Sequence, residues 1–90
     1  MTNKNNKIKS KSFMVKGISA YITGVYSLQE AMYVCIQARW MITPKDLVEV
    51  DNIPENVPRY PLSKRPRFDP REPQCIDMNK EYEYLRESVI

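Results

Sequence analysis

The most regular pattern of apolar residues in the chain runs from residue 27 to residue 42. Plotted at about 100° per residue, its apolar side chains fall on one stripe, which is typical of an amphipathic helix laid on a core. Ser27 and Glu30 have the spacing of a capping box at the helix start, and Pro44 disfavours helical geometry in the residue before it. The pattern therefore predicts a helix that ends near Ile42 and buries Leu28, Ala31, Met32, Cys35, Ala38 and Ile42.

Alternating apolar residues predict a strand on either side of this helix. Before the helix, Phe13 and Val15 share one face, and the alternation continues one residue out of step after Gly17. A β-bulge or a bend at Gly17 would restore the register, because glycine tolerates the backbone conformation that a bulge requires. After the helix, residues 43–46 fit one tight helical turn, and residues 47–50 alternate as a short strand.

Strand, helix and strand in this order predict a right-handed crossover that packs the helix on one face of a sheet. Two strands are too few for a stable sheet. A third strand is therefore expected from residues 74–78, from a fold-back at Gly17 or from another molecule. The predicted fold class is α+β: a small single domain with one main helix packed on a short sheet, a proline-rich extended arm and a short C-terminal helix.

The segments outside this core differ sharply in composition. Residues 1–11 are polar, rich in lysine and without periodicity, which is typical of a disordered arm. Six of the seven prolines lie in residues 54–73 and favour an extended conformation there. The last residues fit a short helix from Asn79, with Tyr82, Leu85 and Val89 on one side. The expected organisation is a disordered basic arm (1–11), a strand–helix–strand core (12–53), a proline-rich basic arm (54–73) and a short strand or turn with the C-terminal helix (74–90).

The net charge of +3 conceals an alternation of charge along the chain. Residues 1–16 contain five lysines and no acidic residue, and residues 58–71 contain five basic residues against one aspartate. The segments between and after these two arms are net acidic. Two basic arms flanking an acidic body favour a macromolecular partner, either nucleic acid or a nucleoprotein assembly.

Few residues of this chain suit catalysis or metal binding. It has no histidine and only two cysteines, so it can form neither a Ser–His nor a Cys–His pair, and it shows no metal-ligand spacing. Glu81, Glu83 and Glu87 fit the solvent face of the last helix. We therefore expect a protein that is not an enzyme and uses no cofactor and no metal. Cys35 is expected to be a buried free thiol of a reduced, cytoplasmic protein, and no apolar run approaches the roughly 20 residues of a membrane span.

The second basic arm is the first candidate binding site. Its basic residues are interleaved with two aromatic residues that could stack on unpaired bases, and arginine pairs well with phosphate. Proline keeps such an arm extended at a low ordering cost. The alternative is that the arm is a strap lying on its own domain. The predicted partner-binding or nucleic-acid-binding residues are Arg59, Lys64, Arg65, Arg67, Arg71, Tyr60 and Phe68.

A second apolar strip on the main helix runs through Tyr33, Ile36 and Trp40. Tryptophan and tyrosine are enriched in the hot spots of protein interfaces, so this strip is a possible protein-binding patch. A tryptophan on a helix flank is more often covered by its own chain. The candidates for such a cover here are Pro58, Tyr60 and Pro61, or Tyr82 and Leu85.

Three features of residues 13–51 carry a resemblance to a known class of proteins. They are the helix opening SLQEA at residues 27–31, Trp40 near the helix end and the return PKDLVEV at residues 44–50. This segment resembles the strand–helix–strand unit of small phage proteins that shut down host machinery, in particular phage inhibitors of bacterial RNA polymerase. The proline-rich arm and the final helix depart from that pattern, so no functional residues are carried over. The resemblance implies a compact non-enzymatic protein that binds a large machine and alters it.

The predicted function is non-catalytic binding to a large macromolecular assembly, the transcription or translation machinery, which the protein engages and modulates. The alternative is an autonomous nucleic-acid-binding regulator that uses its two basic arms. The first function predicts a stoichiometric protein complex that survives moderate salt. The second predicts binding to bare DNA or RNA that weakens steeply as salt is added.

Overall fold

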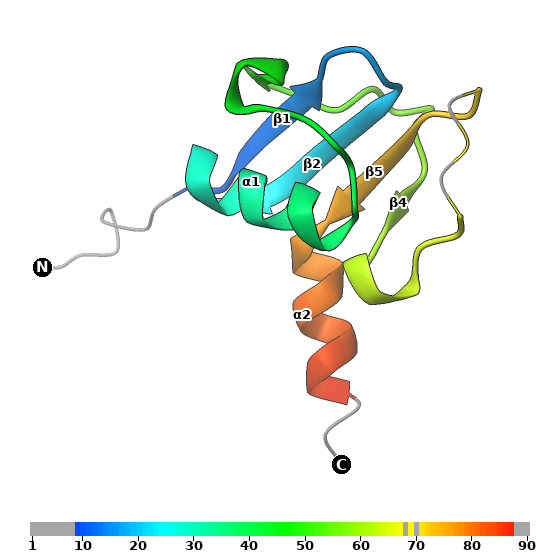
Figure 1. Ribbon diagram of the computed structural model, residues 1–90. Helices are drawn as coiled ribbons and strands as arrows, with labels where there is room; N and C mark the ends of the chain where they lie inside the picture. The colour runs from blue at the N-terminus through cyan, green and yellow to red at the C-terminus, as the bar shows by residue number, and fades with distance from the viewer. Residues whose placement is uncertain (1–8, 68, 70, 88–90) are drawn as a thin grey trace, which may run out of the picture.

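The computed structural model describes residues 9–67, 69 and 71–87 as a small α+β domain, which confirms the predicted fold class. A mixed five-stranded sheet has the order β3-β1-β2-β5-β4, with β5 parallel to both of its neighbours and helix α1 lying across one face (Figure 1). The elements are β1 (Lys11–Val15), β2 (Ala20–Val25), α1 (Leu28–Gln37), the 3-10 turn η2 (Pro44–Asp46), β3 (Leu47–Val50), β4 (Arg59–Tyr60), the 3-10 turn η3 (Leu62–Lys64), β5 (Gln74–Asp77) and α2 (Met78–Glu87).

The chain reverses at Gly17 instead of continuing as one bent strand. β1 and β2 form an antiparallel hairpin in which Val15 lies opposite Ala20, and Gly17 adopts a φ of 87° in the turn. Glycine suits that turn because a positive φ carries no steric penalty for a residue without a Cβ atom. The bulge predicted at Gly17 is thus replaced by the fold-back, and residues 74–77 supply a further strand.

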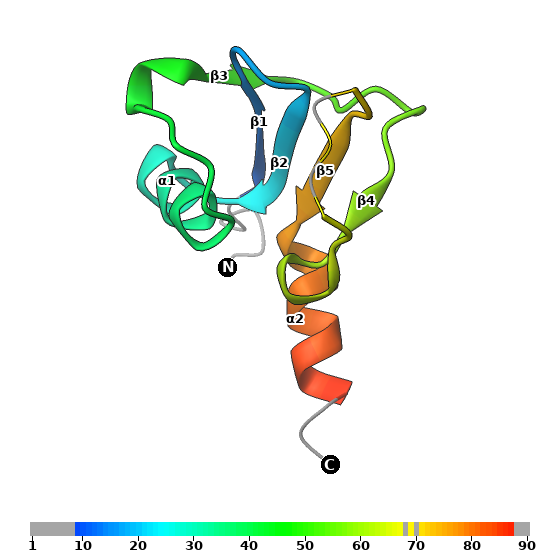
Figure 2. The ribbon, with the colours of Figure 1, turned by 45° about the vertical axis from the view of Figure 1, so that its right-hand side comes forward.

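Helix α1 is a crossover between two parallel strands. β2 and β3 both run antiparallel to β1, which lies between them, so β2 and β3 are parallel to each other. Parallel strands need such a crossover connection, and α1 provides it on one side of the sheet (Figure 2). The predicted helical turn before the return strand and the strand at residues 47–50 are both confirmed.

The main core lies between α1 and the sheet. Ala31, Val34 and Cys35 of α1 are buried in one cluster with the inward side chains of the sheet, among them Ile22 and Ile76. The buried side of α1 includes Val34 and is therefore rotated slightly from the predicted stripe. As a result Leu28, at the edge of that stripe, is 43% exposed, and its assignment to the core is wrong.

Helix α1 also ends at Gln37, five residues before the predicted end at Ile42. Arg39 takes the left-handed conformation with a φ of 63°. Its N–H donates to the carbonyl of Ile36, and the N–H of Trp40 donates to the carbonyl of Cys35, both at 3.0 Å. These two bonds are the Schellman arrangement that closes a helix. An arginine occupies the position where glycine is usual, so no residue type marks this helix end in the sequence.

A smaller core covers the opposite face of the sheet. Ile53 and Val57 of the loop after β3 pack on Cys75, with the half-buried Tyr21 and Val50 beside them. The loop therefore closes over the centre of this face before the chain enters β4. Neither helix in the described part of the chain is long and apolar enough to cross a membrane.

Candidate binding surfaces

The proline-rich arm of the sequence is a strap on the domain's own surface. Residues 61–73, here called the strap and described except for 68 and 70, connect the parallel strands β4 and β5. Near its start, the backbone N–H and the hydroxyl of Ser63 donate to the two carboxylate oxygens of Glu81 at 2.8 and 2.6 Å. Glu81 is only 5% exposed. The strap is thereby tied to the first turn of α2.

Arg65 ties the strap to α1. Its Nη2 donates to the carbonyl oxygen of Ala38 at 2.8 Å, at the end of the helix where the backbone dipole favours a cation. The same guanidinium lies 5.9 Å from the ring centroid of Trp40, within the range of a cation–π contact. Trp40 is 8% exposed. The tryptophan is therefore covered by its own chain, by Arg65 among others, and its assignment to an exposed protein-binding patch is wrong.

The other predicted residues of the basic arm do not form one surface. Arg59 lies 4.0 Å from the carboxylate of Asp77, and the ammonium of Lys64 lies 5.5 Å from the ring centroid of Tyr84. Arg67 and Arg71 are exposed on the strap. Tyr60 is half-buried on the edge strand β4, and Phe68 lies outside the described residues. With Arg65, three of the five basic side chains of the arm make contacts within the chain.

The outer sides of the two helices carry exposed apolar side chains. Tyr33 is 57% and Ile36 is 63% exposed on α1, so both are available to a partner, as a binding role requires. Tyr26, Tyr82 and Leu85 are also exposed. We call Tyr26, Tyr33, Ile36, Tyr82 and Leu85 the tyrosine patch.

Tyr82 of α2 lies near Glu30 and Tyr33 of α1. Partial burial raises the pKa of Tyr82, and the carboxylate of Glu30, the phenol of Tyr26, the carboxylate of Glu81 and the phenol of Tyr33 raise it further. Glu30 itself accepts a hydrogen bond from the backbone N–H of Tyr26 at 2.5 Å, while its own N–H donates to Ser27 Oγ at 3.1 Å. The predicted cap at Ser27 is thus present, with Tyr26 in place of Ser27 as the partner of the Glu30 carboxylate.

The sequence pattern predicts Trp40 as a member of this surface but does not predict Tyr26, Tyr82 and Leu85. Tyr82 and Leu85 were correctly placed on one side of the last helix, but they were treated only as a cover for the tryptophan. Tyr26 lies between a strand and a helix cap, where no periodicity marks its side chain. The sequence feature that could have indicated this surface is the presence of tyrosines both in residues 26–37 and in residues 78–87.

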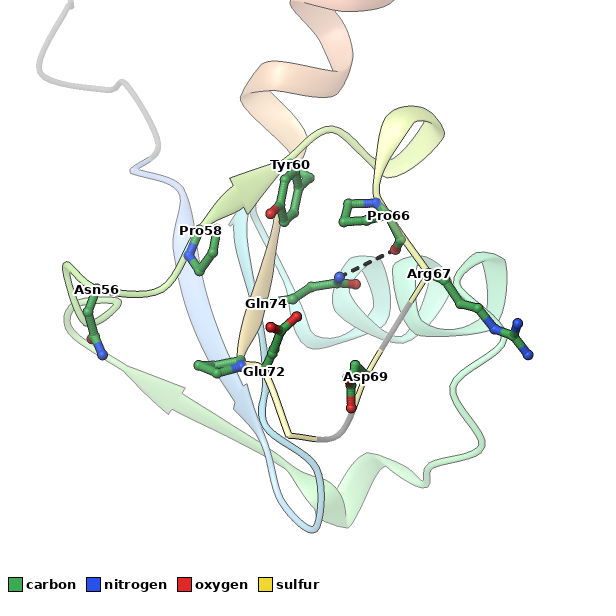
Figure 3. Close-up of a pocket in the computed structure, with 9 residues that line it drawn as sticks. Asn56, Pro58, Tyr60, Pro66, Arg67, Asp69, Glu72 and Gln74 are labelled. Atoms are coloured by element: carbon green, nitrogen blue, oxygen red, sulfur yellow. Dashed lines mark hydrogen bonds between the residues drawn. The ribbon is translucent and has the colours of Figure 1, made fainter.

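The strap encloses a pocket against β4 and β5 (Figure 3). Its cavity volume is about 430 Å³, and its lining includes Tyr60 of β4 and Gln74 of β5. Arg67, Asp69 and Glu72 contribute charged side chains from the strap. Of the predicted arm residues that the structure describes, Tyr60 and Arg67 line this pocket. Among the described residues, no group of three or more histidine, cysteine or acidic side chains is arranged to hold a metal ion.

The two cysteines are free and lie in the separate cores on opposite faces of the sheet. Burial raises the pKa of Cys35 to about 12. Burial also raises the pKa of Cys75 to about 12, with a smaller lowering effect from Arg59 and a smaller raising effect from Asp77. Both thiols therefore stay protonated at neutral pH, and neither is suited to act as a nucleophile.

We expect neither cysteine of the native protein to react with an aromatic disulfide reagent at mildly alkaline pH, and both to react after unfolding. A thiol whose pKa is raised from 9.0 to about 12 binds its proton more tightly in the folded state than in the unfolded state. Its contribution to stability is therefore complete below pH 9.0 and is lost as pH rises towards about 12. Thiol titration and denaturant unfolding across this range measure both effects. Rapid labelling of the native protein would show that a core opens readily.

Comparison with protein-family models, with curated protein sequences and with solved structures finds no significant match for this chain. The resemblance to phage inhibitors of bacterial RNA polymerase is neither supported nor contradicted by these searches and stays a prediction.

Proposed function

We propose that this chain is a small, non-catalytic, cytoplasmic binding protein that docks on a protein surface of a large macromolecular assembly through the tyrosine patch. The observation that carries the proposal is the exposure of Tyr33 and Ile36 on a helix whose inner side is firmly packed. Large apolar and aromatic side chains on a rigid helix are the usual anchors of protein interfaces. Tyrosine also loses little conformational entropy when it is buried by a partner.

Charge around the tyrosine patch favours a protein over a nucleic acid. Glu30 lies close to Tyr82 and one turn before Tyr33 on α1. A carboxylate at this position repels phosphate groups. The complementary surface is an apolar depression on a protein, bordered by a lysine or arginine side chain that faces this carboxylate.

The second candidate function, nucleic acid binding by the basic arms, has less support in the fold. Arg59, Lys64 and Arg65 make contacts within the chain. Arg67 and Arg71 are the exposed arginines of the strap. Such binding would act through them and through the first basic arm, of which residues 1–8 lie outside the described residues. The proposal keeps the function class predicted from the sequence. The partner is a transcription or translation assembly, and the protein modulates it.

Replacing Tyr33 and Ile36 together with serine should weaken binding to the partner protein by about tenfold or more, which corresponds to about 1.4 kcal/mol. The expected loss reflects the apolar area that the partner can no longer bury. The experiment is a quantitative affinity purification from the native host, comparing the double variant with the parent chain. Once a stoichiometric partner is identified, calorimetry with the purified components gives the change in affinity.

The matched control replaces Gln29 and Gln37 with serine, since both glutamines are exposed on the same helix. This control should retain the partner, and nuclease treatment and moderate salt should not release it. A partner that is lost on nuclease treatment, or that depends on Arg67 and Arg71 and not on Tyr33 and Ile36, would establish the nucleic acid alternative instead.

A further inference from the structure

The pocket beneath the strap arises from an unusual connection. Parallel strands are normally joined by a crossover that contains a helix packed on the sheet. Between β4 and β5 the described residues of the connection form the short turn η3 and chain without a further helix, and the segment contains several prolines. Its ends are fixed by the Ser63–Glu81 bonds and by β5. A cavity of about 430 Å³ is left between strap and sheet, at the place of the missing helix.

Gln74 gives this pocket an unsatisfied hydrogen-bond acceptor. Its side chain is 4% exposed and lies on the same sheet face as Ala20, its neighbour in register. Its Nε2 donates to the carbonyl oxygen of Pro66 at 3.5 Å, whereas its Oε1 is buried and accepts no hydrogen bond. A buried acceptor without a partner is costly and rare. The group that would relieve this cost is an N–H or O–H donor.

The polar groups that lie nearest to Gln74 can also accept hydrogen bonds, and the Tyr60 hydroxyl can donate as well. Figure 3 shows the carboxylate of Glu72 and the hydroxyl of Tyr60 turned towards Gln74, whereas the guanidinium of Arg67 points away from it. Pro58, Pro66 and Pro73 line the remaining walls, and proline offers no backbone N–H. Beside Gln74 the described side chains therefore offer more acceptors than donors, and this part of the pocket carries the negative charge of Glu72 and is bordered by an aromatic ring and apolar rings.

We propose that this pocket binds the guanidinium group of an arginine side chain presented by a partner peptide. Guanidinium is a planar cation with five N–H donors and no acceptor. It can donate to Gln74 Oε1 and to the Glu72 carboxylate together, and it packs well on aromatic and proline rings. The site is built from the strap, the loop before β4, β4 and β5, and its lining residues include none of the tyrosine patch. It is therefore a second recognition site, and it stands whether or not that patch is the main interface.

The test is a nuclear magnetic resonance titration of the full-length ¹⁵N-labelled chain with N-acetyl-arginine-N-methylamide. Saturable shifts are expected for the side-chain amide of Gln74 and the backbone amide of Tyr60. The citrulline analogue, which has the same shape without the charge, should bind about fivefold more weakly or worse, because charge-assisted hydrogen bonds are roughly twice as strong as neutral ones.

Variants then separate a cation site from an anion site. Glu72 is exposed, so Glu72→Gln should leave the thermal transition unchanged and weaken arginine binding by about fivefold or more. Glu55→Gln, an exposed charge change in the neighbouring loop and outside the pocket, should leave binding unchanged. Arg67→Gln should leave binding unchanged or strengthen it, since it removes a like charge.

Three results would overturn the proposal. One is the absence of a saturable shift with the arginine derivative. Another is undiminished arginine binding by Glu72→Gln. The third is preferential binding of a nucleoside monophosphate that is lost in Arg67→Gln, which would identify the pocket as a site for nucleic acid. None of these results bears on the tyrosine patch, because its variants are tested against a different ligand.

Discussion

Replacing Gly24 with alanine is expected to lower the free energy of unfolding by about 3 kcal/mol, from a left-handed backbone and a steric clash together. Gly24 has a φ of 82°, a conformation that costs a residue with a Cβ atom about 1–2 kcal/mol. A Cβ atom there would also lie 3.0 Å from the backbone nitrogen of Asn79 and 3.2 Å from that of Met78. Both nitrogens belong to the first turn of α2, so β2 and α2 would have to move apart.

The matched control is Gly17→Ala. Gly17 has a similar φ of 87°, but a Cβ atom built on it meets nothing within 4 Å. The free energy of unfolding of this variant should fall only by the cost of the left-handed backbone conformation, about 1 kcal/mol. Urea unfolding of both variants, with equal m-values, gives the difference directly. Equal losses at the two positions would mean that α2 yields freely and that its position is not fixed by β2.

The helix and the strands were predictable where side-chain periodicity decides the structure. The stripe through Ala31, Cys35 and Ala38 fixes the inner side of α1, and the alternation at residues 47–50 fixes β3. The end of α1 was missed because Arg39 takes a conformation that sequences normally mark with glycine. The shifted alternation at Gly17 fits a bulge, a bend or a fold-back, so the sequence alone does not decide between one bent strand and the hairpin.

The binding surfaces were less predictable, because they depend on which charged groups find partners within the fold. Arg65 is of a residue type that often binds phosphate, yet it caps the end of α1 and covers Trp40. Glu81 fits a solvent face by spacing but is buried beneath the strap. The pocket has no sequence signature at all. Gln74 becomes significant only because β5 places it under a crossover that contains no helix.

The anchoring of the strap by Glu81 leads to the other large effect that we expect. Glu81→Ala should lower the free energy of unfolding by about 2 kcal/mol, because two hydrogen bonds to a charged acceptor are lost and the N–H of Ser63 no longer has its protein acceptor. The loss should be local at first. Limited proteolysis should therefore cut the strap of the variant faster than the strap of the parent chain, while the sheet core stays protected.

Glu83→Ala is the matched control, since Glu83 is exposed on the same helix and such surface changes usually alter stability by no more than about 0.5 kcal/mol. Ser63→Ala removes only the hydroxyl donor, so its cost should be about 1 kcal/mol. Combined with Glu81→Ala it should add almost nothing, because the bond between the two side chains is already gone. Additive losses in the double variant, or equal losses for Glu81→Ala and Glu83→Ala, would show that the Ser63–Glu81 pair does not hold the strap. The pocket would then lack the fixed wall that arginine binding requires.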